Sequence, residues 1–382
     1  VNPGGPEAWG FGGNVKSIDD PVPHFNITPR DIIRGLCKVN KLLNLPHTIH
    51  VHTNNLGKPG NYTTALKTMQ CVKDLAEQDR PAIHITHCQF CAFKGSDWAT
   101  MRSGAEEIAK YVNGHNHVTM DMGQVVFTDT TTMTADGPFQ YSLYGLTGNK
   151  WINHDVETET CAGIVPFRYR RKSPVHAIQW SIGLELALLI EDPWRIYLTT
   201  DHPNGAPFTT YPQVASWLMS QVARRVTMKK ISKRARKKSL LPSIGREYSF
   251  YEITIATRAG PAKALGLKYK GHLGLGADAD VALYNIDPTL VDFSKEYKKI
   301  KKALSNAAYT IKDGEIVVKD GEIVKTVPGK TFWVDVKVSS PMGPTEDLKR
   351  KFREYWTVEY ENYPIPEEYL KASAPITVQA RI

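Results

Sequence analysis

Histidine and aspartate residues stand at the ends of three apolar, strand-like segments of this sequence. In chain order they are His50, His52, His84, His87 and Asp201. Imidazole nitrogens and a carboxylate oxygen are ligands for a divalent metal ion such as Zn²⁺, and a metal with only three protein ligands keeps a position open for water. Water bound in this way becomes a nucleophile near neutral pH. The residue types therefore predict metal-dependent hydrolysis if the fold brings these side chains together.

Spacing alone does not choose between the two histidines of each segment. His50 and His52 are two positions apart, so a strand points both side chains to the same side. The later histidine lies nearer the carboxyl end of its strand and is better placed to reach the mouth of a barrel. We therefore expect His52, His87 and Asp201 to be the metal ligands, with His50 and His84 as alternatives. Asp201 is also the expected catalytic proton acceptor.

The elements that carry these residues repeat at a constant interval. The expected strand ends, His52, His87 and Met122, are 35 residues apart in both steps. Apolar positions with helical spacing lie before and between the strands. The expected helices span 28–44, 61–79, 103–113 and 176–190, and the expected strands span 48–52, 82–87, 117–122 and 195–200. Repeated strand–helix units of this length predict an α/β protein with a TIM-like parallel (β/α) barrel.

The texture of the chain predicts three regions. The barrel takes residues 1–265, with an insertion at about 123–175 that is rich in Thr, Asp, Gly and Tyr and is expected over the open face of the strands. Two Asp-Gly turns between alternating strands place a small β-sandwich domain at 266–340. Residues 341–382 are expected to form a C-terminal tail.

Composition excludes several classes of protein. The 382 residues are 41% hydrophobic and carry a net charge of +9. No apolar run reaches the roughly 20 residues of a membrane span, no signal peptide is visible, and five cysteines do not form a disulfide framework, so we expect a cytoplasmic protein. Nine Lys or Arg fall within residues 224–238. We do not expect nucleic acid as the partner of this block, because no recognition motif accompanies it; an acidic subunit, an acidic substrate tail or plain solvation remain open.

Other polar residues are weaker candidates for binding substrate. Asn54 and Asn55 follow the first histidine segment and can offer amide donors to a formyl oxygen, although loop capping explains them as well. Arg102 can bind a carboxylate, although surface solvation is the simpler reading. Cys88 and Cys91 form a lone CxxC, which we read as two buried or loop cysteines.

Several segments resemble the amidohydrolase superfamily. TRAGPAKALGL at 257–267 and KGHLGLGADADVALY at 270–284 are similar to the run that follows its barrel. VNPGGPEAWGFGGN, HVHTNNLG, HITHCQFCAF and LTTDHPNGAPFTTYP more narrowly resemble the amidohydrolase-type subunit family of formylmethanofuran dehydrogenase, over nearly the whole chain. The resemblance implies a barrel of eight strands, of which the later half is present, and a small C-terminal β domain.

The resemblance also implies a site and partners. In the superfamily two metal ions, implied here as a binuclear Zn²⁺ centre, take a His-x-His pair, a lysine, two histidines and an aspartate. The two histidines match His52 and His87, and the aspartate matches Asp201. The implied reaction condenses formate with methanofuran, or hydrolyses the formamide, during CO₂ reduction in archaeal methanogenesis. The implied partners are redox and iron–sulfur subunits that carry a tungsten or molybdenum pterin and the clusters.

The sequence departs from that pattern at its start. It begins at Val1 with loop-like residues, and no His-x-His strand or lysine ligand can be matched. We therefore expect it to be the later part of a longer protein. The alternatives are an amidohydrolase-like subunit of a formyltransferase/hydrolase complex, a cyclic-amide hydrolase and a catalytically incomplete scaffold subunit.

Overall fold

The computed structural model describes most of the chain. The described residues are 3–4, 15–23, 26–78, 80–134, 152–153, 163–339, 345–355, 359–362, 368 and 373–381. Proximity of the backbone divides the chain into two compact units. The larger consists of residues 1–37 and 47–325, and the smaller of residues 38–46 and 326–382. Both histidine segments and Asp201 belong to the larger unit.

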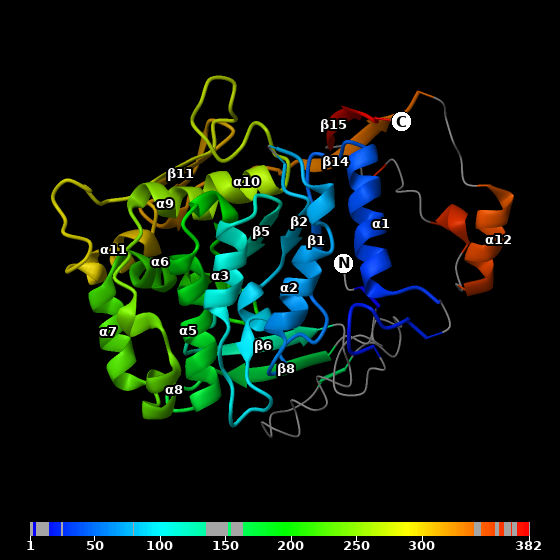
Figure 1. Cartoon of the computed structure of the whole chain (residues 1–382). Coiled ribbons are helices and arrows are strands. Elements are labelled where there is room, and N and C mark those ends of the chain that lie inside the picture. Colours follow the sequence, from blue (N-terminus) through cyan, green and yellow to red (C-terminus); the bar gives the residue numbers. More distant parts are fainter. Residues whose placement is uncertain are drawn as a thin grey trace. The chain divides into compact units, whose positions relative to one another are not determined.

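A parallel sheet of four strands forms the centre of the larger unit (Figure 1). The strands pair in chain order and are β1 (Ile49–Val51), β2 (Ile83–Ile85), β5 (Val118–Asp121) and β9 (Ile196–Tyr197). In register, His50 lies opposite His84, and His84 lies opposite Thr119. All four carboxyl ends therefore meet at one edge, which is the arrangement expected for the later half of a parallel barrel.

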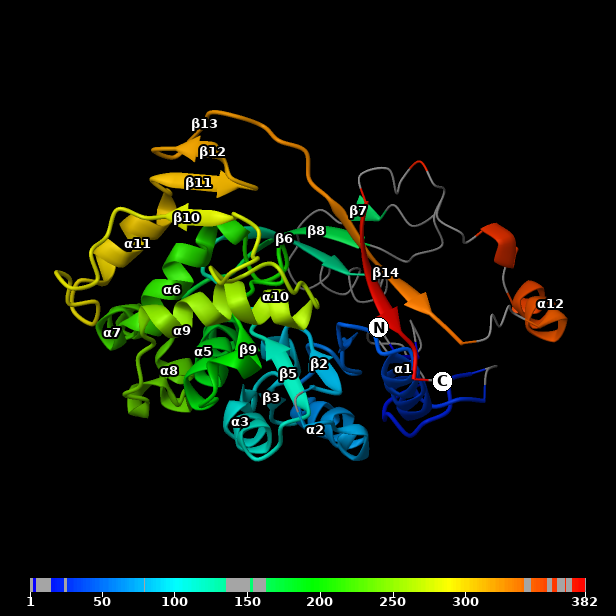
Figure 2. The ribbon, with the colours of Figure 1, turned by 90° about the horizontal axis from the view of Figure 1, so that it is seen from above.

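Helices connect the strands and follow their order along the sheet. Helix α3 contacts both α2 and α5, and Figure 2 shows this layer beside the strands. The helices of this layer are α2 (Tyr62–Gln70), α3 (Ala105–Asn113) and α5 (Pro174–Leu189). Helix α3 directs Ile108 and Val112 into the core. Helix α5 is apolar on nearly all sides and is mostly buried, so it is a core helix rather than a surface one.

Two expected elements have different bounds in the structure. The helix expected at 61–79 ends at Gln70 and is followed by a 3₁₀ turn, Lys73–Leu75. Between them the backbone of Val72 leaves the helical region, with φ −118° and ψ 11°. The strand expected at 195–200 pairs only at Ile196–Tyr197, because the amide of Leu198 instead bonds to the carbonyl of Ala256.

The expected insertion carries antiparallel strands. Strands β6 (Asp129–Thr134) and β8 (Gly163–Arg168) pair along their length, and β7 (Ile152–Asn153) joins the far end of β8. The remaining parts of the predicted insertion, 135–151 and 154–162, lie outside the described residues. A shorter hairpin, β3 (Phe93–Lys94) with β4 (Arg102–Ser103), leaves the main sheet after β2.

The Asp-Gly pairs make the turns that the sequence predicts. Asp313-Gly314 and Asp320-Gly321 all have positive φ, as the tight hairpin turns require. They connect the last three strands of an antiparallel sheet, β10 (Val281–Leu283), β11 (Tyr309–Lys312), β12 (Glu315–Lys319) and β13 (Glu322–Ile323). This sheet belongs to the larger unit.

The remaining helices complete the two units. In the larger unit they are α6 (Tyr211–Met219), α7 (Gln221–Lys230), α8 (Lys233–Lys238), α9 (Phe250–Thr254), α10 (Gly260–Ala264), α11 (Tyr297–Ser305) and most of α1 (Pro29–Leu42). The smaller unit pairs β14 (Thr331–Lys337) in parallel with β15 (Ser373–Gln379) and contains α12 (Glu346–Tyr355). Among the described helices, none is long and apolar enough to cross a bilayer.

Candidate active site

Two of the three predicted metal ligands meet at the carboxyl ends of β1 and β2. Nε2 of His87 lies 2.7 Å from Nδ1 of His52, and the ring centroids are 4.7 Å apart. His52 follows β1 directly, and His87 follows β2 by two residues. His87 is buried, and its other nitrogen, Nδ1, has no hydrogen-bond partner in the described structure. The pairing of His52 with His87 supports the choice of the later histidine in each segment.

The backbone at two of these residues is left-handed. His87 has φ 36° and Asp201 has φ 49°. Such conformations cost side-chain-bearing residues on the order of 1–3 kcal/mol and concentrate at functional sites. Around His87 the chain is packed tightly, since a Cβ added to Gly123 would lie 2.6 Å from the Cβ of His87. The turn after β2 is therefore held in one position by the segment after β5.

Asp121, the last residue of β5, is a site residue that sequence reasoning did not identify. Its carboxylate lies 3.1 Å from Nε2 of His84 and accepts hydrogen bonds from the backbone amide of His87, at 3.0 Å, and from the hydroxyl of Thr199. The carboxylate thus connects β2, the turn after it and the segment after β9. The available signal was a single charged residue inside the otherwise apolar and hydroxyl-bearing strand around Met120.

The alternative ligands, His50 and His84, lie one layer deeper. Their rings face each other with centroids 4.4 Å apart, and His84 stacks on Tyr197. Both nitrogens of His84 are engaged, Nδ1 with Thr119 at 3.0 Å and Nε2 with the carboxylate described above. His84 is therefore built into the sheet by its hydrogen bonds and supports the layer that carries the other pair.

Charge divides the pair of imidazoles unequally. Burial, with the nearby His87, lowers the pKa of His52 to about 3, so His52 is neutral and keeps a lone pair for a ligand. Burial alone would lower the pKa of His87 as well, but the negative charge of Asp201 outweighs it and raises that pKa to about 9. Burial raises the pKa of Asp201 to about 6.

Asp201 belongs to the surroundings of the pair. Its side chain accepts a hydrogen bond from Nδ2 of Asn204 at 3.1 Å, and its charge reaches His87. Even so, the described ligand atoms of His52, His87 and Asp201 do not all lie within 4.8 Å of one another. The structure thus brings two predicted ligands into contact and places the third near them.

This donor set fits a divalent cation. The site already stabilises one positive charge, the proton on His87, with Asp201 and Asp121 as the negative groups that favour it. A metal ion must displace such a proton to reach the imidazole nitrogen. The neutral ring of His52 and the unpartnered Nδ1 of His87 are the kind of groups that a bound ion satisfies.

The predicted substrate-binding residues have partners of their own. Nδ2 of Asn54 donates to the carbonyl of Pro3 at 3.0 Å, while its Oδ1 is buried without a hydrogen bond. Nδ2 of Asn55 donates to the carbonyl of Lys16 at 2.7 Å. Arg102 is exposed on β4. The side chains of Asn54 and Asn55 thus stabilise loops.

Three aspartates form the one close acidic group found among the described residues. The ligand atoms of Asp278, Asp280 and Asp313 lie within 4.8 Å of one another. Nζ of Lys270 lies 2.8 Å from Asp278 and 2.5 Å from Asp280, and Nζ of Lys312 lies 2.5 Å from Asp313. Because two ammonium groups already neutralise the carboxylates, the cluster is a network of ion pairs in the small sheet.

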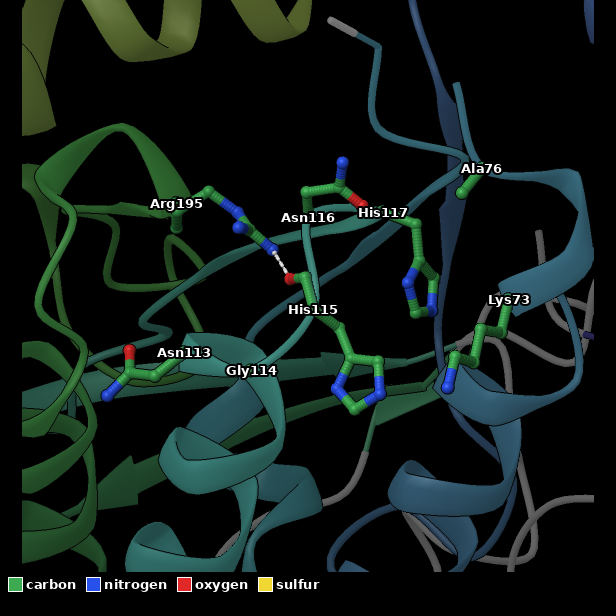
Figure 3. A pocket seen from close by; sticks show the side chains of 8 residues that line it. All are labelled: Lys73, Ala76, Asn113, Gly114, His115, Asn116, His117 and Arg195. Carbon is green, nitrogen blue, oxygen red and sulfur yellow. Dashed lines mark hydrogen bonds between the residues drawn. The ribbon is translucent and has the colours of Figure 1, made fainter. Parts of the chain in front are cut away.

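A cavity of about 490 Å³ opens at the opposite ends of the strands (Figure 3). His115 and His117 precede β5, and Arg195 precedes β9, so these lining residues stand at the amino ends of the sheet. Arg195 is held by backbone carbonyls, and Nε2 of His117 lies 3.0 Å from the carbonyl of Met69. Residues from the carboxyl ends do not line this cavity, so it is separate from the histidine pair.

Comparison with known families identifies the fold. The model of an amidohydrolase family matches residues 4–318. The chain belongs to the amidohydrolase family. The predicted fold class, an amidohydrolase-type (β/α) barrel with its later half present and further small sheets, is confirmed.

Two curated relatives extend the match along the chain. Protein FwdA of Methanocaldococcus jannaschii is 51% identical over 389 residues, which cover 100% of this chain and 68% of that protein. The A-type component of the formyltransferase/hydrolase complex Fhc of Methylorubrum extorquens is 39% identical over 348 residues, covering 90% of this chain and 60% of the relative. This amidohydrolase thus spans about two thirds of the length of these relatives, and the predicted narrower resemblance is confirmed.

A solved relative shows the same architecture. The crystal structure of the FhcABCD complex from Methylorubrum extorquens, bound to methylofuran, contains a chain that matches with a TM-score of 0.82 and 35% identity. The match covers 94% of this amidohydrolase and 64% of that chain. Relatives of the amidohydrolase described here therefore include a component of a multi-subunit formyltransferase/hydrolase complex.

Proposed function

We propose that the chain is the metal-binding part of an amidohydrolase subunit that breaks and forms the C–N bond of a formamide. The reaction joins formate to the amine of methanofuran, or reverses that step, inside a formylmethanofuran dehydrogenase complex. The observation that carries the proposal is the contact between His52 and His87, 2.7 Å apart at the carboxyl ends of neighbouring strands, with Asp201 beside them. The relatedness to FwdA supports the choice of substrate.

The residues divide the chemistry among them. A bound divalent metal ion, Zn²⁺ in this proposal, supplies an activated water and polarises the formyl oxygen. His52 and His87 hold that ion by their imidazole nitrogens, and the site as proposed is binuclear when the whole subunit is considered. Asp201, whose pKa is raised to about 6, takes the proton of the attacking water at neutral pH and returns it to the departing amine nitrogen.

The chain works with other subunits in this proposal. Iron–sulfur subunits and a subunit with a tungsten or molybdenum pterin carry out the redox chemistry and hold those cofactors, while this chain handles only the C–N bond. The complex is proposed to act in the cytoplasm during CO₂ reduction. Support comes from the relative whose solved structure is the FhcABCD complex.

Replacing His87 in the full-length subunit, within its complex, tests the proposal. We expect His87→Ala to lower bound zinc and to reduce formylmethanofuran hydrolysis at least about 100-fold, because it removes a ligand. His115→Ala is the matched control, since that histidine lies at the amino ends of the strands and is expected to leave both values unchanged. Full zinc content and full activity in His87→Ala would exclude the proposed centre.

A second candidate function keeps the chemistry and changes the carrier. The relatedness to the Fhc chains favours a formyltransferase/hydrolase complex that acts on a methylofuran-type amine. Comparing kcat/KM for the formyl derivatives of methanofuran and methylofuran separates the two. Normal zinc loading with no hydrolysis of either compound would instead indicate a scaffold subunit.

A further inference from the structure

Helices α7 and α8 carry a dense group of cations, exposed or partly exposed, on the larger unit. We define the α7–α8 basic surface by its members, Arg225, Lys229, Lys230, Lys233, Arg234, Arg236, Lys237 and Lys238. Within the part of the chain that the structure describes, none of the eight forms an ion pair with a carboxylate. This distinguishes the surface from α12, where Lys349, Arg350 and Lys351 all pair with nearby Glu or Asp.

The ninth cation of the block has a different role. Arg224 is 1% exposed, and its guanidinium donates to the carbonyls of Trp217 and Arg246, both at 2.7 Å. It therefore fastens α7 to the segment that follows α8. The structure thus separates one internal cation from eight that reach the surface.

The surface is held firmly against the β3–β4 hairpin. Nζ of Lys238 donates to the carbonyls of Ala99 and Met101, both at 3.0 Å, and Arg234 also donates to the carbonyl of Ala99. Desolvation, Arg234 and Arg102 together lower the pKa of Lys238. Like charges are thus gathered here without ion-paired carboxylates that would offset their repulsion.

Further cations and one apolar side chain border the surface. The backbone amide of Ser232 donates to the carbonyl of Arg171 at 2.9 Å, which brings the segment after β8 alongside the start of α8. Arg171 and Lys172 are exposed there, and Trp98 is 40% exposed in the hairpin next to Ala99. Figure 1 shows α8 at the same end of the larger unit as β6 and β8.

Trp and Arg are the side chains that most often anchor protein interfaces, surrounded by a charged rim. A single exposed Trp is not a stacking platform of the kind that single-stranded nucleic acid requires. The observations therefore favour a protein partner over nucleic acid.

We propose that the α7–α8 basic surface, with Trp98 at its edge, docks an acidic face of another subunit of the complex. The inference rests on the proposed function only for the existence of that complex. Opposite charges across the interface speed association and set its orientation. A partner in this position would lie beside the β6–β8 strands at the end of the unit where the histidine pair stands.

Charge reversal in the assembled complex tests the proposal. The triple variant Lys229→Glu, Lys233→Glu, Lys237→Glu is compared with Lys298→Glu, Lys301→Glu, Lys302→Glu on α11, which changes the same charge on another exposed helix. We expect the α7–α8 variant to bind its partner subunits at least about 10-fold more weakly and the α11 variant to bind as wild type. Rising salt should weaken the wild-type complex and erase the difference.

Two further measurements make the result decisive. Replacing the same three lysines by Gln should give a smaller loss of affinity, and Trp98→Ala should weaken binding without changing its salt dependence. Zinc content and formamide cleavage should be retained by the isolated α7–α8 variant, whereas His87→Ala should lose both and still dock, so the two proposals fail separately. Unchanged assembly of the charge-reversed variant, or loss only of binding to a duplex DNA or RNA probe, would overturn the docking proposal.

Discussion

Asp121 supports the histidine pair through three hydrogen bonds, and replacing it should affect the metal more than the fold. An amide in Asp121→Asn keeps the shape but removes the negative charge next to Nε2 of His84 and the backbone amide of His87. Losing such a supporting carboxylate typically costs about 10–100-fold in metal affinity or activity. We expect zinc affinity of the full-length subunit to fall by that factor, measured by competition with a chelating dye.

A matched control separates this effect from a general loss of stability. Asp129→Asn removes a carboxylate whose ion pair with Arg168 is largely exposed, and exposed pairs contribute at most about 1 kcal/mol. We expect Asp129→Asn to retain wild-type zinc affinity. If Asp121→Asn binds zinc as tightly as wild type, Asp121 does not position the site.

At the residue scale the sequence predicted the pair but not its support. The residue types and the interval of 35 positions were sufficient to select His52 and His87. Asp121 escaped because its role depends on the register between β2 and β5, which places it beside His84. A one-dimensional pattern does not contain that cross-strand relationship.

The turn after β5 controls the position of the turn after β2. Gly123 has φ 61°, and a Cβ there would stand 2.6 Å from the Cβ and 2.7 Å from the Cα of His87. Gly123→Ala therefore combines backbone strain with a collision that only a shift of His87 relieves. We expect a loss of at least about 2 kcal/mol in the free energy of unfolding together with weaker zinc binding.

Gly35→Ala provides the contrast for this prediction. Gly35 lies inside α1, and nothing lies within 4 Å of the added Cβ. Alanine is preferred over glycine in a helix by roughly 1 kcal/mol, so this variant should be neutral or slightly more stable. Equal chemical denaturation midpoints for Gly123→Ala and Gly35→Ala would contradict the steric argument.

His176, in the first turn of α5, should make stability depend on pH. Burial lowers its pKa to about 4, and its Nδ1 accepts a hydrogen bond from the backbone amide of Arg170 at 2.9 Å. Between pH 6.5 and about 4 the unfolded chain takes up a proton here that the folded chain refuses, so stability falls as pH falls, by up to about 1.4 kcal/mol per pH unit. His176→Gln should flatten the decline between about pH 7 and 5, measured by urea unfolding.

The exposed His272 offers the control for that measurement. His272→Gln should leave the slope of stability against pH as in wild type. An identical slope for His176→Gln and wild type would show that the proton uptake occurs elsewhere.

At the scale of elements, prediction was best where local chemistry decides the outcome. The Asp-Gly hairpin turns are specified by φ preferences within two residues, and the structure has them. The bounds of β9 are not specified locally, because Leu198 has the side chain of a strand residue but its amide bonds to Ala256, far along the chain. Tertiary partners of this kind lie beyond periodicity.

For the molecule as a whole, the two most informative features of the sequence belong to different surfaces. The histidines converge at the carboxyl ends of the sheet, while the basic block divides into the buried Arg224 and the α7–α8 basic surface. The sequence predicted the charge, but only the structure shows which of the nine cations is internal. Catalysis and assembly are thus assigned to separate residues, which allows them to be tested separately.

Metal removal should lower the stability of the whole subunit. A ligand that binds only the folded state stabilises it by about 2.7 kcal/mol when present at 100 times its Kd. A zinc chelator should therefore lower the unfolding temperature of the full-length subunit by several degrees, and added Zn²⁺ should restore it. His115→Ala should respond as wild type, whereas His87→Ala should unfold at the same temperature with and without the chelator. Because the pKa of His87 is about 9 before metal binds, rebinding at about pH 7.5 should also release a proton, seen as buffer-dependent binding heat. A chelator shift of equal size in His87→Ala would place the metal elsewhere.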